Sequence, residues 1–298
     1  MKRKLLSATL ALSILATSMG TVFAENPKAE EYRQMFANGT YYIDYDANDN
    51  IRKSLAVKDG KRMDYTILMV KNSFLVTNAL AMINPLLGVA SMFSKNVKRD
   101  PTALYQDGKY YQFISKKEAR MVTSAQLEDE NLDPTEAWNS VQLRLALPEG
   151  FVMLAPNDPF NGVANYTVPT FVESGTITDG KNTFAYDTYK APIKGATGNV
   201  IADKIFYLYY DNKNGELKRV ITRFKEPGDS MEQTISEFKI RTITNELPEF
   251  ALKIPGGTKV YAAGLGDMDD LLDRNVLIEE FPDDDNEGSS GKEKNDEE

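Results

Sequence analysis

The sequence has neither histidine nor cysteine among its 298 residues. Without imidazole, Ser-His-Asp and Cys-His nucleophilic sites cannot form, and most zinc and iron sites lose their usual ligand. Without cysteine there is no disulfide and no lipid attached to a cysteine, so stability must come from a hydrophobic core. We therefore predict a non-catalytic protein with no metal and no cofactor. An acid–base hydrolase with two facing carboxylates is the remaining catalytic alternative.

Two short motifs match a calcium-binding loop and a catalytic Ser-x-x-Lys pair, but the residues around them argue against both functions. Residues 46–50 read Asp-x-Asn-x-Asn, as in a calcium loop, but Ile51 replaces the required glycine and Val57 the bidentate glutamate. Residues 236–239 match Ser-x-x-Lys, but they fall in a predicted strand, where the serine and the lysine point to opposite faces. We interpret the first motif as a solvated loop and the second as a chance match.

Basic clusters are absent as well. The chain has 35 Lys and Arg against 44 Asp and Glu, a net charge of −9. No run of cations could follow a phosphate backbone, so we do not expect a nucleic-acid partner. Residues 282–298 carry eight acidic residues against two lysines and no large apolar side chain. We predict a disordered acidic tail over 282–298 that adds solubility, with cation or protein binding as the alternative.

The N-terminus indicates export. Lys2, Arg3 and Lys4 precede an apolar core over residues 5–19, and residues 22–24 offer small residues at the positions that a signal peptidase reads. We therefore predict a signal peptide over 1–24, with a retained signal anchor as the alternative, and a periplasmic or otherwise extracytoplasmic protein. Residues 25–281 are then expected to form a single β-rich domain.

Hairpins dominate this domain. Asp-Gly or Asn-Gly pairs at residues 59–60, 107–108, 179–180 and 214–215 each lie between strand-like segments, and these pairs tolerate the positive φ of tight antiparallel turns. Alternating apolar residues predict strands over 40–46, 51–58, 62–70, 110–114, 171–178, 183–190, 204–210, 217–224, 231–242 and 250–254. Helices are expected over 27–36, from Asp133 to about Leu147, and over 268–278. We expect the lone tryptophan, Trp138, to fill the core. The predicted class is α+β, mainly β: a curved antiparallel sheet, an open half-barrel, wrapped around a few helices.

One long apolar stretch interrupts this pattern as a helical insertion over about 72–100. Residues 72–94 contain no charge, and Pro85 lies near their middle. On a helix, small and polar residues form one narrow stripe, and large apolar residues fill the remaining arc. Three interpretations stay open: a core helix, a lid over an apolar cavity, and a membrane span, which Pro85 disfavours. If the helix lines a cavity, its ligand-binding residues are Leu75, Met82, Ile83, Leu86, Leu87, Met92 and Phe93.

Two stretches in the last third resemble a known family. Residues 209–220 (YYDNKNGELKRV) and 245–257 (NELPEFALKIPGG) are similar to the closing strands of periplasmic lipoprotein carriers, the LolA-like and outer-membrane lipoprotein-sorting proteins. The resemblance implies an open half-barrel whose concave face receives acyl chains. A short first helix, the 72–100 insertion and the acidic tail depart from the family pattern, and no binding residue of the family can be assigned to a position here.

Two functional hypotheses follow. The first is binding of a lipid, an acyl chain or another apolar ligand in the concavity, in envelope lipid or lipoprotein handling, which is compatible with peripheral membrane association. The second is an envelope interaction module that binds a protein or a glycan through its sheet surface.

Overall fold

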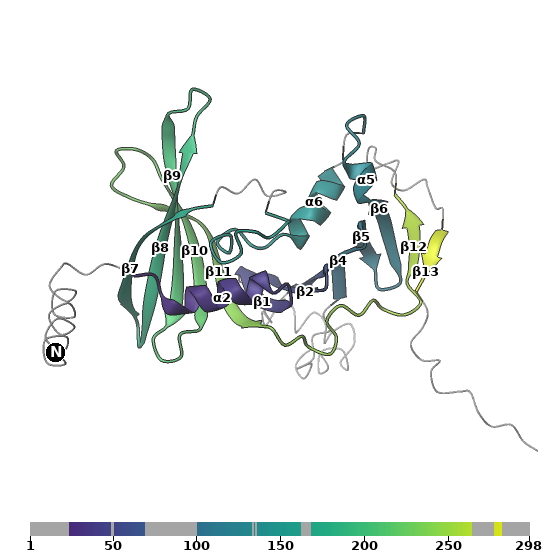
Figure 1. The fold of residues 1–298 in the computed structure, drawn as a ribbon, viewed down its shortest axis with the longest axis horizontal. Coiled ribbons are helices and arrows are strands. Elements are labelled where there is room, and N and C mark those ends of the chain that lie inside the picture. The colour runs from purple at the N-terminus through teal and green to yellow at the C-terminus, as the bar shows by residue number, and fades with distance from the viewer. Residues whose placement is uncertain are drawn as a thin grey trace, which may run out of the picture. The chain divides into compact units, whose positions relative to one another are not determined.

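The computed structural model describes residues 24–48, 51–68, 100–132, 134, 136–161, 168–263 and 277–281. The contacts that residues make in space group the chain into two compact units. The first unit comprises the residues up to 31 together with 168–236, and the second comprises 32–167 together with 237–298. The expectation of one domain over 25–281 stays a prediction, and each unit is described by itself (Figure 1).

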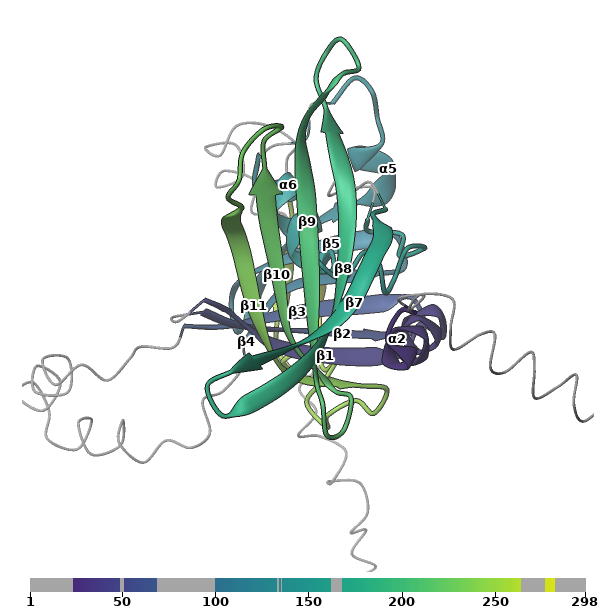
Figure 2. The same ribbon diagram turned by 90° about the vertical axis from the view of Figure 1, so that its left-hand side faces the viewer.

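The first unit is built on four long strands, namely β7 (Thr170–Asp179), β8 (Asn182–Lys194), β9 (Val200–Asp211) and β10 (Leu217–Lys225). Each strand pairs antiparallel with the next one in the chain, in the order β10-β9-β8-β7 (Figure 2). Aromatic and β-branched residues are frequent in these strands because such side chains pack well on a pleated surface. The result is a meander with β7 at its free edge.

One face of this meander is buried and contains a carboxylate. Alternation along β8 places Asp187 and Tyr189 on this face, where both are almost completely buried. The backbone N–H of Asn26 donates to both oxygens of Asp187, at 3.1 and 3.0 Å, and the hydroxyl of Ser174 donates to it as well. Burial raises the pKa of Asp187 above its usual range. These bonds tie the start of the described chain to the sheet.

The second unit contains a larger open sheet. Its strands are β1 (Tyr41–Asn48), β2 (Ile51–Lys58), β3 (Lys61–Leu68), β4 (Asp100–Gln106), β5 (Lys109–Ser115), β6 (Glu118–Thr123), β11 (Gln233–Thr244), β12 (Lys259–Ala262) and β13 (Leu277–Glu280). Their order is β13-β12-β6-β5-β4-β3-β2-β1-β11, with the first four residues of β11 assigned to the first unit. Neighbours pair antiparallel except β6 and β12, which are parallel.

Three helices are described. They are α2 (Pro27–Ala37), α5 (Ser124–Leu127) and α6 (Glu136–Leu145). The side chain of Asn26 accepts from the backbone N–H of Lys28 at 3.0 Å, which satisfies a free donor at the start of α2. Thr123 and Gln126 form a capping box on α5. Helix α6 packs against the sheet strands β3, β4 and β5 (Figure 1). Its residues Trp138, Val141 and Leu145 are buried in the core on this side of the sheet.

The predicted hairpin turns are confirmed. Asp59 and Gly60 have φ of 51° and 79°, and Asp107 and Gly108 have φ of 51° and 73°. Positive φ at both central residues is the geometry of a type I′ turn, whose twist matches that of the flanking strands. The turns at 179–180 and 214–215 also connect adjacent antiparallel strands of the first unit.

Both faces of the second-unit sheet are covered. On one face, Tyr42, Met63, Tyr65 and Leu104 pack with the residues that follow β11, including Leu247, Ala251, Leu252 and Ile254. On the other face, Ala103 and Val122 pack with α6 and Phe160. Since successive residues of a strand point to opposite faces, β3 and β4 contribute to both layers. We call the face that contacts α6 the helix-side face.

The predicted fold class is confirmed: the protein is mainly β, with open antiparallel sheets and few helices. Ten strands were predicted, and nine of them are present; the one predicted over 250–254 is wrong. Residues 250–253 form turns instead, with Leu252 at φ 62°, and Phe250 packs edge-on against Tyr42 and Tyr65. The apolar residues of this segment thus cover a sheet face and pair with no strand.

Of the other predictions, two helices are confirmed, one helix is wrong at its end, and the rest concern residues that the structure does not describe. Helix α2 and helix α6 are confirmed, although α6 begins at Glu136. The helix predicted over 268–278 is wrong at its end, because Leu277 and Ile278 open strand β13, where they pair with β12. Its remaining residues, the signal peptide and the acidic tail lie outside the described residues. In the part of the chain that the structure describes, no helix is both long and apolar enough to cross a membrane.

Candidate functional site

The seven ligand-binding residues predicted on the 72–94 stretch all lie outside the described residues. The structure therefore places none of Leu75, Met82, Ile83, Leu86, Leu87, Met92 and Phe93, and the interpretations of that stretch stay predictions. Trp138 is a residue of α6 and is completely buried, so the expectation that it fills the core is confirmed. Ser236 and Lys239 lie in β11, as the interpretation of their motif as a chance match requires.

The helix-side face of the second unit is an apolar surface with a few polar groups. Strand pairing aligns Tyr41 with Val57 and Ile43 with Leu55, and all four side chains are almost completely buried. The same pairing places Arg62 beside Val57, with Asp64 two residues further along β3. An apolar lining with a small number of polar anchors is the usual composition of a small-molecule site.

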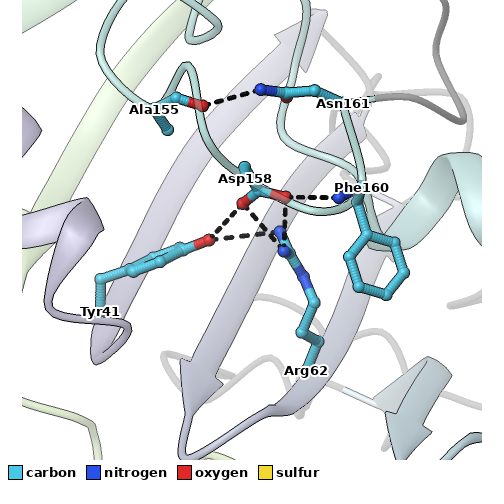
Figure 3. Close-up of polar contacts among 6 residues, drawn as sticks. All are labelled: Tyr41, Arg62, Ala155, Asp158, Phe160 and Asn161. Carbon is cyan, nitrogen blue, oxygen red and sulfur yellow. Dashed lines mark hydrogen bonds and ion pairs between the residues drawn. The ribbon is translucent and has the colours of Figure 1, made fainter.

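A buried ion pair crosses from this face to the loop after α6. Arg62 donates through one terminal nitrogen to both oxygens of Asp158, at 2.7 and 2.8 Å (Figure 3). Their side chains are 3 % and 5 % exposed, so two opposite charges are held away from water. Removing a charge from water costs several kcal/mol, and only good geometry and further hydrogen bonds offset this cost.

Those further bonds come from the neighbours of the pair. The Tyr41 hydroxyl donates to Asp158 at 3.0 Å and accepts from the second terminal nitrogen of Arg62 at 3.2 Å (Figure 3). The backbone N–H of Phe160 donates to Asp158 at 2.8 Å, and the Phe160 ring lies 4.3 Å from the Arg62 guanidinium carbon. Burial raises the pKa of Tyr41 above its usual range, which keeps the hydroxyl protonated as a donor. We call Tyr41, Arg62 and Asp158 the polar clamp.

The polar clamp holds a segment that is folded mainly on itself. Residues 146–161, the covering segment, close successive turns, with Phe151 N–H bonded to Pro148 O, Leu154 N–H to Phe151 O and Asp158 N–H to Ala155 O. The Asn161 amide bonds the Ala155 carbonyl at 2.7 Å (Figure 3). The apolar side chains of the segment are buried: Ala146, Leu147, Phe151, Val152, Met153, Leu154, Ala155 and Phe160.

A second link reaches the covering segment from α2. Arg33 donates to the backbone carbonyl of Met153 at 3.0 Å, and Phe36 contacts Tyr41 and Phe151 edge-on. The described hydrogen bonds between the segment and its surroundings are therefore made largely by side chains, whereas the backbone bonds above stay within the segment. Contacts of this kind can be exchanged one group at a time without breaking a strand ladder.

Asp64 is the second buried carboxylate near the helix-side face. It is 1 % exposed, and the hydroxyl of Thr102 donates to it. Burial raises its pKa above the usual range, while Lys53 and the Thr102 bond partly oppose that shift. No group of three or more potential metal ligands is present among the residues that the structure describes.

Sequence reasoning did not find the polar clamp. Arg62 and Asp158 are 96 residues apart, and nothing in a single sequence pairs them. A signal was nevertheless available: Asp158 interrupts an apolar stretch, FVMLAPNDPF over 151–160, inside a loop. A charge surrounded by buried apolar residues requires a partner, so this aspartate could have been singled out.

Comparisons with known proteins do not add a family to this description. No protein-family model matches the chain, and no curated protein matches it. The resemblance of residues 209–220 and 245–257 to lipoprotein carriers therefore stays a prediction.

Proposed function

We propose that this protein is a non-catalytic, exported binder of a lipid, an acyl chain or another apolar ligand. The ligand occupies the space between the helix-side face of the second unit and the covering segment, residues 146–161. The observation that carries the proposal is the polar clamp. A mainly self-bonded apolar segment lies on an apolar sheet face, and a buried Arg62–Asp158 pair joins the two.

The covering segment resembles its ligand chemically. Its buried Phe151, Met153 and Leu154 side chains occupy the apolar surroundings that a hydrocarbon chain would use. Methionine adapts well to partners of irregular shape. When a ligand enters, the segment lifts, and apolar contacts with the ligand replace apolar contacts with the segment. The free-energy difference between the closed protein and the protein with the segment lifted is then set largely by the polar clamp.

Buried ion pairs suit such a role. Replacing them with apolar residues is often neutral or stabilising, so their value lies in selecting one arrangement over others. Here the selected arrangement is the closed one. The predicted signal peptide and the resemblance to lipoprotein carriers support the same function, since envelope proteins of that kind handle acyl chains.

The experiment compares two aspartates with a fluorescent fatty acid as probe. Asp158→Asn weakens the polar clamp, and we expect it to raise the affinity for the probe about tenfold, which corresponds to about 1.4 kcal/mol. Asp44→Asn is the matched control. The Asp44 side chain is also 5 % exposed and also pairs with an arginine, Arg52, but alternation along β1 places it on the face opposite to Tyr41.

A direct readout of lifting is available because the chain has no cysteine. A single Met153→Cys variant labelled with an environment-sensitive dye should report transfer of residue 153 to water when the probe binds. The proposal fails if the fatty acid does not bind to the wild-type protein or to Asp158→Asn. It also fails if the probe binds while the dye at residue 153 stays buried.

A further inference from the structure

The predicted cleavage site of the signal peptide lies next to residues that are held on the first-unit meander. Cleavage is expected before Glu25, and Ala24, on the other side of that peptide bond, is exposed. Glu25 and Asn26 are both partly buried, and the chain continues from Pro27 as α2. The chain is therefore accessible just before the predicted cleavage point and packed against the sheet just after it.

Two side chains of β8 hold the residues after the cleavage point. The backbone N–H of Asn26 donates to both oxygens of Asp187, at 3.1 and 3.0 Å. The hydroxyl of Tyr189, two residues further along β8 on the same face, donates to the Glu25 carboxylate. Asp187 and Tyr189 are only 1 % and 2 % exposed. The first two residues of the predicted mature chain are thus fixed by buried side chains of the sheet.

Asp187 carries an acidic group in partly apolar surroundings. Strand pairing places it between Ser174 of β7 and Leu208 of β9, and Leu208 is completely buried. The backbone N–H of Asn26 and the hydroxyl of Ser174, which donate to Asp187, are neutral groups. Among the residues that the structure describes, no lysine or arginine forms an ion pair with it. Because a buried carboxylate without a counter-charge is costly, a cation at this position would stabilise the folded unit.

The titration of Asp187 agrees with the lack of a counter-charge. Burial raises the pKa of Asp187 above its usual range, and the nearby Glu25 carboxylate adds to this rise. The hydrogen bonds from Ser174 and Asn26 oppose the rise only in part. A positive charge beside the two carboxyl groups would lower the pKa of Asp187 and keep it ionised.

Signal-peptide cleavage creates a positive charge at this place. A signal peptidase hydrolyses the bond between Ala24 and Glu25 with one water molecule: the carbonyl carbon of Ala24 gains an oxygen and becomes a carboxylate, and the nitrogen of Glu25 is released as an amine. An α-amino group has a pKa of about 7.7–8.0, so most of it is protonated at neutral pH. Adjacent residues are about 3.8 Å apart, so the new ammonium group lies one residue from the Asn26 N–H that already bonds Asp187.

The same contacts would have a simpler explanation if they served only the start of α2. A carboxylate near the N-terminus of a helix is favourable, and Asn26 caps α2 through the backbone N–H of Lys28. That interaction is available at the surface and does not require a carboxylate that is 1 % exposed. It does not require the bond from Tyr189 to Glu25 either, because Glu25 precedes the helix. Anchoring of a chain end explains both features.

We propose that Asp187 binds the α-ammonium group that cleavage creates at Glu25. In the precursor, Asp187 accepts hydrogen bonds from neutral donors. In the processed chain, the ammonium group and Asp187 form a buried ion pair, while Tyr189 retains the Glu25 side chain. The first unit is then more stable after processing than before it. This inference rests on the export proposed above and does not depend on the apolar ligand.

The test compares a chain that starts at Glu25 with one that starts at Ala24, each released from a fusion partner without extra residues. The additional residue moves the ammonium group about 3.8 Å further along the chain, away from Asp187. An amine-acylating reagent at pH 7 should label the α-amino group of the Glu25 chain about tenfold more slowly, because the ion pair holds the proton on the amine. Peptide mass spectrometry measures the rate, and Asp187→Asn should remove the difference between the two chains.

Stability provides a second readout that needs no substitution. Denaturant unfolding should give the Glu25 chain an unfolding constant about tenfold smaller than that of the Ala24 chain, which corresponds to about 1.4 kcal/mol. Acetylation of the Glu25 α-amino group removes its charge and should cancel this advantage. Asp203→Asn is the matched control: Asp203 lies on the neighbouring strand β9, is paired with Lys190 at 2.7 Å, and should change both chains equally.

Equal labelling rates and equal unfolding constants for the two chains would overturn the inference. The cleavage point is checked separately, by the mass of the chain that is exported with its own N-terminal segment. A start at Glu25 supports the inference, and a start at any other residue would refute it. None of these results depends on fatty-acid binding, so the inference and the proposed apolar site can fail independently.

Discussion

The two units use the same antiparallel hairpins for different purposes. In the second unit both faces of the sheet are covered, so β3 and β4 contribute Met63 and Leu104 to one layer and Arg62 and Ala103 to the other. In the first unit one face is buried, while the other holds partly exposed tyrosines and arginines beside the buried Tyr209. A sheet that separates two cores contributes stability, whereas a sheet with one accessible face can contribute recognition. Substitutions in the two units should therefore differ in kind.

The largest effect is expected in the doubly covered sheet. Leu104 is completely buried among Tyr42, Met63 and Tyr65, so Leu104→Ala leaves a cavity and should lower the free energy of unfolding by about 2–5 kcal/mol. Denaturant unfolding followed by the fluorescence of Trp138, the only tryptophan, reports on this unit.

The counterpart in the first unit is Val172→Ala on the edge strand β7. Val172 is 50 % exposed, so we expect a loss within about 0.5 kcal/mol. If the two substitutions cost the same, the contrast between a covered and an accessible sheet is wrong.

A smaller, pH-dependent effect is expected from Asp64. Burial raises its pKa in the folded state above the value of about 3.9 found in unfolded chains. The folded protein therefore keeps a proton on Asp64 at pH values where the unfolded chain has lost it. The contribution of this group is most favourable below about pH 4, and it falls as the pH rises from there through the raised pKa.

Comparison with Asp64→Asn isolates this contribution. Because asparagine does not titrate, the stability of the wild type relative to the variant should fall by up to about 1.4 kcal/mol per pH unit above pH 4. Denaturant unfolding at a series of pH values measures the difference. A difference that does not change between pH 4 and pH 7 would show that Asp64 titrates normally and is not desolvated.

Much of the strand pattern could be predicted because it depends on local turn chemistry. The Asp-Gly pairs at 59–60 and 107–108 require positive φ, and that requirement is visible in the residues themselves. Strands β4, β6 and β12 were missed for a physical reason. β4 opens with Asp100-Pro101, a pair that disfavours a strand, and the parallel pairing of β6 with β12 joins segments about 140 residues apart. Whether such segments form strands is decided by their pairing in the tertiary structure and not by local propensity.

For the candidate site, the sequence predicted the chemical composition but not the residues that form it. A mostly apolar surface with few polar anchors was expected, but the polar clamp joins β1, β3 and a loop that lie far apart in the sequence. The alignment of tyrosines and arginines on one face of the first-unit meander could be predicted more easily from the sequence. Alternation along β9 already places Tyr207 and Tyr209 on one side, and the Asn214-Gly215 turn brings Arg219 opposite Tyr209. Only the pairing of β7 with β8 shows that Gly175 supports Tyr186.

The smallest effect on stability is expected for Gly175→Ala. The new methyl group would meet the Tyr186 hydroxyl oxygen at 2.6 Å, so the ring must leave its place over β7. Alanine is favoured over glycine in a strand by about 0.5–1 kcal/mol, and the lost ring contact costs about as much, so the net change should stay within about 1 kcal/mol. The NMR resonances of Tyr186 should nevertheless shift. Thr176→Ala, the next residue of β7, points to the opposite face and should leave these resonances unchanged. If Gly175→Ala leaves the Tyr186 resonances unchanged, the ring does not rest over β7, and the contrast between a covered and an accessible sheet loses this support.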